Sequence, residues 1–279
     1  MTLIAVIGAG PTGGALARTL AGRSRVSEVR LIDPEGRIAD GKALDILQSS
    51  PIEQFSARVT AAGSIPAAAG ADAIVLADLV ATGEIGGEAG LALLRQLARL
   101  DTSAPILFAG GAQRELMVRG LDELHLSPRR LIGSAPLALE SSVRAFTAAL
   151  LDGSPTDLSI GIAGVPPRDA VIGWDAATAF NQPIAAVLAA HHMAALSSRL
   201  PALWPPPAYT LASAAARIAE ALAVGTRRRY TCFAAVDVSG AGRNLVAAVP
   251  VEIVRGGIGK VIEPALSRHE RTAFENGLR

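Results

Sequence analysis

Three glycines near the start of the chain, Gly8, Gly10 and Gly13, are followed after twenty residues by an acid, Asp33. Glycine permits a tight turn and lets the backbone approach a diphosphate, because no Cβ stands in the way. The free amide groups of a helix N-terminus then face the phosphates, and a carboxylate at this distance bonds ribose hydroxyls. The spacing therefore predicts a dinucleotide site.

The segments around these residues support that prediction. Leu3–Ile7 is a continuously apolar run, typical of a parallel strand covered on both faces, and helical spacing follows the glycines. A second apolar run, residues 29–32, stops at the acid. An acceptor-only carboxylate at this point, with Glu35 nearby, would repel a 2′-phosphate, which favours NAD over NADP. The predicted cofactor-binding residues are Gly8, Ala9, Gly10, Pro11, Thr12, Gly13 and Asp33.

The segment Gly41–Pro51 resembles the stretch after the ribose-binding acid in the lactate and malate dehydrogenase family, most closely the bacterial malate dehydrogenases. Looser likenesses follow in family order at residues 71–75, 130–134, 208–222, 249–251 and 270–274. The resemblance implies an α/β fold, in which residues 1–134 form a Rossmann-type, doubly wound parallel sheet that binds NAD. It implies a smaller mixed α+β domain for residues 135–279.

The pattern of apolar residues agrees with that division. Strands and helices alternate in the first part, whereas residues 230–238 and 244–254 predict an antiparallel pair around the glycine-rich residues 239–242.

The family's chemistry needs a histidine acid, a carboxylate that orients it, and arginines that hold the substrate's carboxylate. The family's arginine-bearing loop corresponds to residues 77–90, but no Lys or Arg occurs between Arg58 and Arg95. Glu84 and Glu88 stand in that loop instead. The charge expected to attract an anionic substrate is therefore reversed.

Two further motifs of the family are also altered. Its Asn-Pro pair becomes Gly110-Gly111, and its histidine-containing loop becomes residues 164–169, which include no histidine. The amide and the imidazole that would act on the substrate are absent from both places.

The family's Leu-Asp-x-x-Arg motif has two possible counterparts. Counting without gaps from Gly133 puts Leu139 and Ser142 at the Asp and Arg positions. Arg144 then lies two residues beyond the Arg position, about 200° around the helix, and faces away from the place of the family's arginine. With one inserted residue, Glu140 and Arg144 replace the pair at a spacing of four, which shares a helix face. We prefer the ungapped count.

An active site rebuilt from other residues is the alternative. Its candidates are Glu140 and Arg144 together with Arg168, His191 and His192. Both histidines lie in an alanine-rich stretch, residues 184–200, that predicts a helix. Adjacent helix positions point about 100° apart, so at most one of them could face a cleft.

The bulk properties favour a globular protein of one or two domains: 279 residues, 50% hydrophobic, 18% charged and a net charge of +1. Arg227–Arg229 follows a helical pattern, where cations near the helix C-terminus are ordinary, so we expect no nucleic-acid binding. No apolar run is long enough to span a bilayer, and the first strand leaves no room for a signal peptide. We expect a cytoplasmic protein without a metal site, in which the single cysteine, Cys232, is packed.

These observations predict a malate and lactate dehydrogenase-like, NAD-binding protein that has lost 2-hydroxy acid chemistry. The alternative is an active NAD-dependent oxidoreductase whose rebuilt site takes a less anionic small-molecule substrate. A third possibility is a scaffold without cofactor, because Asp78 adds a carboxylate where the family has backbone near the pyrophosphate. The resemblance also implies a homodimer or homotetramer, with residues 42–47 in contact with the partner.

Overall fold

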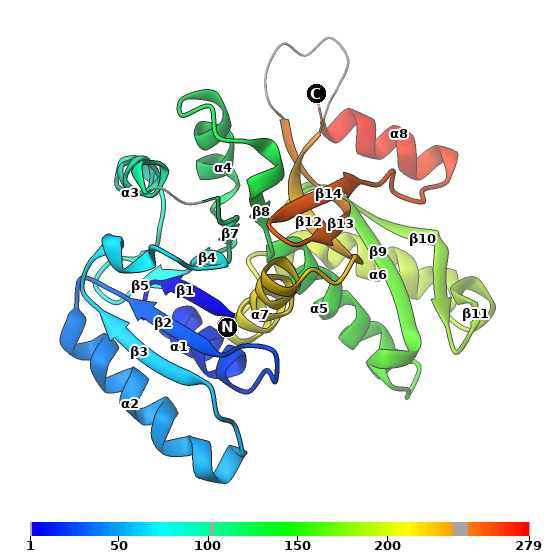
Figure 1. Ribbon diagram of the computed structural model, residues 1–279. Coiled ribbons are helices and arrows are strands. Elements are labelled where there is room, and N and C mark those ends of the chain that lie inside the picture. The colour runs from blue at the N-terminus through cyan, green and yellow to red at the C-terminus, as the bar shows by residue number, and fades with distance from the viewer. Residues whose placement is uncertain (1, 101–102, 237–244, 279) are drawn as a thin grey trace.

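A large sheet forms the centre of the protein in the computed structural model, which describes residues 2–100, 103–236 and 245–278 (Figure 1). Eleven strands follow the order β11-β10-β9-β13-β12-β8-β7-β4-β1-β2-β3, and β14 pairs with β13. Neighbouring strands are antiparallel from β11 to β8 and parallel from β8 to β3. The predicted α/β fold is confirmed.

The parallel end carries the first half of the chain. Its strands pair in register, and Ile4 lies between Val29 and Ala73. Every residue of Ile4–Ile7 is buried, as a strand covered on both faces requires. The strands are β1 (Leu3–Ile7), β2 (Glu28–Ile32), β3 (Arg58–Ala62), β4 (Ala73–Leu76), β7 (Ile106–Phe108) and β8 (Leu131–Gly133).

Helices cover both faces of this parallel part. Alternate strand residues belong to two different core clusters, so Val6 packs with Leu16 of α1, whereas Ile7 packs in the cluster of Leu91 on α3. Figure 1 shows α1 and α2 on one side of these strands and α3 and α4 on the other. The four helices are α1 (Pro11–Ala21), α2 (Gly36–Glu53), α3 (Gly87–Arg99) and α4 (Arg114–Asp122).

The second half of the chain is mixed, as predicted. The expected antiparallel pair is confirmed for the described residues: β12 pairs with β13 from Arg228↔Ile253 to Val236↔Leu245. Residues 237–244, including the glycine-rich 239–242, lie outside the described residues. The elements of this half are α5 (Ala135–Leu150), β9 (Leu158–Val165), β10 (Asp169–Ala179), β11 (Gln182–Pro183), α6 (Ala190–Arg199), α7 (Ala208–Val224), β12 (Arg228–Val236), β13 (Leu245–Val254), β14 (Gly257–Val261) and α8 (Arg268–Gly277), together with 3-10 turns at residues 155–157, 184–186 and 200–203. Two more 3-10 turns, at residues 65–68 and 128–130, belong to the first half.

Two features join the halves. The pair Phe233↔Gly133 connects β12 to β8, so the sheet is continuous, and α7 shares the core of the parallel part with α1. The division at residue 134 into two domains stays a prediction.

The single helix predicted for residues 184–200 is wrong in extent. A 3-10 turn occupies Ile184–Ala186, and the helix begins only at Ala190 because Ala189 is extended, with ψ 145°. Among the described residues, no helix combines the length and the apolar character needed to cross a membrane.

Candidate functional site

The glycine turn between β1 and α1 is as tightly packed as its sequence predicts. Gly8 has φ +107°, and a Cβ there would lie 2.4 Å from the carbonyl oxygen of Asp78. A Cβ on Gly13 would lie 1.9 Å from the carbonyl oxygen of Gly8. Helix α1 starts at Pro11, and its N-cap residue, Gly10, has no side chain with which to cap the free amides. Those amides are therefore available to another acceptor.

The carboxylate of Asp78 is that acceptor. Its Oδ1 accepts from the amide of Gly13 at 2.8 Å and its Oδ2 from the amide of Thr12 at 3.1 Å. The backbone carbonyl of the same aspartate accepts from the amide of Gly10 at 2.7 Å. A Cβ on Gly10 would meet the Asp78 carboxyl carbon at 2.5 Å, so this side chain fills the space that the glycine leaves. An anion occupies the helix N-terminus, as the helix dipole favours, and it belongs to the protein itself.

Asp33 is turned inward. It is 1% exposed, and its Oδ2 accepts from the amides of Ala9 at 2.8 Å and Val80 at 3.1 Å. Its Oδ1 accepts from the amide of Glu35 at 2.9 Å. Three backbone donors thus hold the carboxylate that the sequence assigns to ribose hydroxyls, and its role in the structure is to join the glycine turn to the segment after β4.

Lys42 of α2 closes the turn from another side. Its Nζ donates to the carbonyl of Ala9 in a short contact and to the carbonyl of Gly10 at 3.2 Å. From the sequence, Lys42 is expected only in the partner-facing segment of α2, and no motif predicts its contact with the turn.

A short hairpin, β5 (Asp78–Leu79) and β6 (Gly83–Glu84), extends the closure to the next loop. Glu84 accepts from the amide of Ala112 at 2.6 Å, and a Cβ on Gly110 would lie 2.1 Å from the Glu84 Oε1. Burial raises the pKa of Glu84, and the nearby Asp78 carboxylate acts in the same direction, although the Ala112 amide opposes it. Asp78 therefore accepts from amides of the glycine turn, and Glu84 accepts from an amide of the loop at residues 110–112.

Gln113 holds the second loop in place, although no motif in the sequence points to it. It is 1% exposed, accepts from the amide of Gly110 at 2.9 Å, and donates to the carbonyls of Ala77 at 3.2 Å and Ile85 at 3.3 Å. Both ends of the hairpin segment are thus tied to the residues that replace the Asn-Pro pair.

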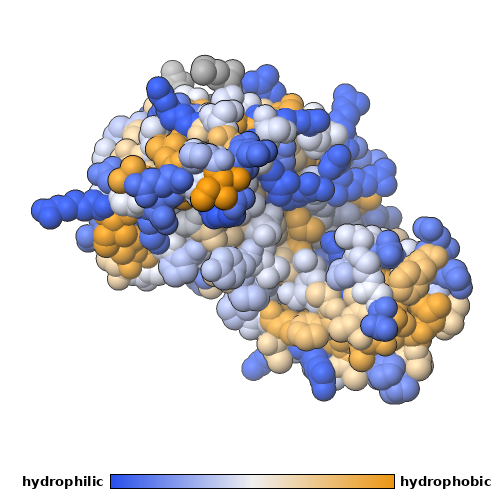
Figure 2. Space-filling view, turned by 90° about the horizontal axis from the view of Figure 1, so that it is seen from below, coloured by the Kyte–Doolittle hydropathy of each residue, from blue (hydrophilic) through white to orange (hydrophobic). Residues whose placement is uncertain are grey.

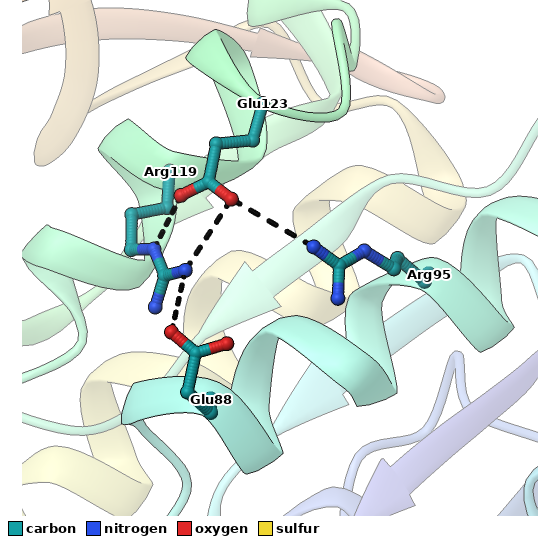
Figure 3. A network of polar contacts seen from close by, with 4 residues as sticks. All are labelled: Glu88, Arg95, Arg119 and Glu123. Carbon is teal, nitrogen blue, oxygen red and sulfur yellow. Dashed lines mark hydrogen bonds and ion pairs between the residues drawn. The ribbon is translucent and has the colours of Figure 1, made fainter.

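Glu88 lies in a different network, between α3 and α4 (Figure 3). Arg119 contacts it at 2.8 Å and contacts Glu123 at 2.5 Å, while Arg95 lies 3.7 Å from Glu123. Hydrogen bonding to Glu123, and then to Glu88, raises the pKa of Arg119, and the bond to Arg119 lowers the pKa of Glu123. Of the two loop acids, only Glu84 reaches the candidate site.

The structure brings Glu140 and Arg144 together on one face of α5. Arg144 lies 2.6 Å from the Glu140 Oε1, and Thr231 of β12 donates to the Oε2 in a short contact. Glu140 is 9% exposed, and this burial raises its pKa although the Arg144 charge lowers it. The pair lines a hollow shared with α7 and β12 that includes no residue of the glycine turn.

The other candidates are not joined to this pair. Arg168 is exposed in the turn between β9 and β10, and the rings of His191 and His192 lie 4.0 Å apart on α6. Within the described ranges, no hydrogen bond or ion pair links these three residues to Glu140 or Arg144. Among the same residues, no group of three His, Cys, Asp or Glu side chains could hold a metal ion.

The architecture matches solved dehydrogenases over nearly the whole chain. The malate dehydrogenase of Salinibacter ruber has a TM-score of 0.88 at 24% identity, covering 99% of this chain and 94% of that one. A lactate dehydrogenase of Cryptosporidium parvum, solved with lactic acid and nicotinamide adenine dinucleotide, has a TM-score of 0.84 at 19% identity. The chain has the fold of the malate and lactate dehydrogenases.

Sequence similarity supports homology to the same enzymes. A malate dehydrogenase of Thermomicrobium roseum is 25% identical over 97% of this chain and 93% of its own length. No family model matches the chain.

The site does not fit a dinucleotide as it is arranged. A diphosphate at the helix N-terminus would need the amides that Asp78 holds and would meet its negative charge. A ribose would need acceptor oxygens on Asp33 that already serve three backbone amides. The chain thus has the fold of these dehydrogenases, and its own Asp78 and Asp33 accept from the amides of the glycine turn.

Proposed function

We propose that this protein is a non-catalytic relative of the malate and lactate dehydrogenases. NAD, when bound to such a fold, supplies or accepts a hydride. In the segments that resemble the family's motifs, residues 77–90 contain no arginine and residues 164–169 contain no histidine. The observation that carries the proposal is the double closure by the hairpin, in which Asp78 caps α1 and Glu84 caps the loop at Ala112.

The rebuilt oxidoreductase site has less support. Its acid and arginine, Glu140 and Arg144, point to β12, and Arg168 and the two histidines lie elsewhere. We therefore expect any small-molecule ligand of these residues to bind away from the place of the nicotinamide.

Self-association is proposed from the resemblance and from the surface of α2. Leu44 is 56% exposed on α2, and Tyr209, at the start of α7, is 82% exposed beside a hollow that Lys42 also lines. Figure 2 shows that hydrophobic side chains gather in separate patches on one face of the molecule. We propose a homodimer or homotetramer in which residues 42–47 meet the partner.

The first test is titration with NADH, followed by the fluorescence of the reduced nicotinamide. We expect no saturable binding by the natural protein and saturable binding by Asp78→Ala, because this variant frees two amides and removes a repulsive charge. Asp40→Ala, an exposed acid of α2, is the matched control and should behave like the natural protein.

Two results contradict the proposal. Saturable NADH binding by the natural protein contradicts the closed site. Turnover of oxaloacetate or pyruvate in the ordinary enzyme range, on the order of 1 to 10³ per second, contradicts the loss of catalysis.

A further inference from the structure

A second hollow, of about 390 Å³, lies between α5, α7 and β12, away from the glycine turn. Three arginines from three different elements line it: Arg144 of α5, Arg217 of α7 and Arg229 of β12. Tyr230 and Thr231 complete its polar wall. These three arginines line one hollow only because the fold brings α5, α7 and β12 together.

Two of the three arginines are not neutralised by the acids around them. Glu140 pairs with Arg144, whereas the side chains of Arg217 and Arg229 make no ion pair or hydrogen bond among the described residues. Glu252 faces Arg229 across the β12–β13 pair without reaching the 4.0 Å of an ion pair. Two guanidinium groups therefore remain for a ligand.

Arg144 also has an unused donor inside the wall. Its Nε is buried without a hydrogen-bond partner, while Glu140 and Thr231 hold the rest of this cluster. A buried donor without an acceptor lowers stability, and an anionic ligand in the hollow would supply one.

The field around the hollow is positive as well. Arg217 and Tyr230 also line an adjoining hollow of about 350 Å³, where Arg23, Arg25 and Arg228 gather around Glu220. Of these, Arg23 lies 3.9 Å from Glu220. Arg217 stands in the middle of α7, so attraction to the C-terminal end of that helix does not explain its position.

We propose that this hollow binds a small dianion of the phosphate-monoester type. The two unpaired guanidinium groups match a dianion, and arginine provides planar, paired donors that suit phosphate oxygens. The small volume of the hollow and the chain's net charge of +1 favour a small molecule over a nucleic acid. This site goes beyond the proposed loss of catalysis and does not depend on it.

The test is calorimetric titration with inorganic phosphate and with glycerol 3-phosphate, at constant ionic strength. Glycerol is the neutral control ligand. We expect saturable binding of both phosphates, weakened at least about tenfold in Arg217→Gln and in Arg229→Gln, since each loses a charge-assisted hydrogen bond. Arg99→Gln removes an exposed arginine of α3 and should bind as the natural protein does. Circular dichroism checks that all four proteins are folded.

Three outcomes overturn the proposal. The first is that the natural protein binds neither phosphate when the ligand concentration reaches about ten millimolar, which would mean a Kd too high for a specific site. Arg99→Gln weakens binding as much as the other two variants, which indicates a general ion effect. A short DNA duplex binds through Arg217 and Arg229 and glycerol 3-phosphate does not displace it, which indicates a nucleic-acid surface.

Discussion

At the scale of single residues, two aspartates decide what the glycine turn does. A carboxylate has four lone-pair sites and accepts from several amides at once, so it replaces an anionic ligand at a helix N-terminus. Asp78, the first residue of β5, does this for the amides of Thr12 and Gly13. Asp33, just after β2, instead accepts from three amides that lie outside the helices. The same residue type that is read as a ribose contact is here a structural brace.

This brace predicts a stability effect for Asp33. Asp33→Ala leaves the amides of Ala9, Glu35 and Val80 without acceptors in a buried place, so we expect a loss of about 2–4 kcal/mol in the free energy of unfolding. Urea unfolding without any ligand measures it. Asp40→Ala should change the value by less than about 0.5 kcal/mol. An unchanged stability for Asp33→Ala would indicate that the carboxylate serves only a ligand.

A second residue-scale prediction concerns Glu140. Burial raises its pKa, so the folded state holds this proton more tightly than the unfolded state does. Its contribution to stability is therefore complete at low pH and falls as the pH rises above the ordinary value of 4.5. We expect the unfolding free energy of the natural protein, minus that of Glu140→Gln, to decrease from about pH 4 to pH 7. An increase over that range would show that the Arg144 contact outweighs burial.

At the scale of elements, the sequence predicts what depends on neighbours in the chain. Strand β1, the turn and α1 follow from an apolar run, three glycines and helical spacing, which act over about a dozen residues. The closure of the turn depends on Asp78, 65 positions from Gly13, and on Lys42, 33 positions from Ala9. Of these two residues, only Asp78 could be noticed in the sequence, as a carboxylate where the family has none. That its side chain points into the turn follows from the β5–β6 hairpin, which the sequence does not predict.

The element that carries Cys232 gives another prediction. Strand β12 is central in the sheet, Cys232 is 0% exposed, and burial raises the pKa of its thiol, which disfavours the reactive thiolate in the folded protein. Iodoacetamide should label this single thiol only as fast as the strand opens, and the rate should rise with urea. Labelling at the rate of a free thiol in native buffer would contradict the packing.

At the scale of the whole molecule, the two halves share both a sheet and a core. The residues predicted as a second domain contribute α7, which packs with α1, and β12, which continues the sheet from β8. Linkage of this kind favours cooperative unfolding, because neither half keeps its core when the other opens.

The last prediction follows from that linkage. In native-state hydrogen exchange, the amides of β1 and of β13 should report the same free energy of opening, and a single urea transition should be seen by every probe. The joint itself is testable with Gly133→Ala, whose added Cβ would lie 2.8 Å from the Cβ of Phe233. This variant should lower protection in β1 and in β13 equally, because it separates the sheet at their common boundary, whereas a loss confined to β9 to β14 would show that residues 1–134 fold independently.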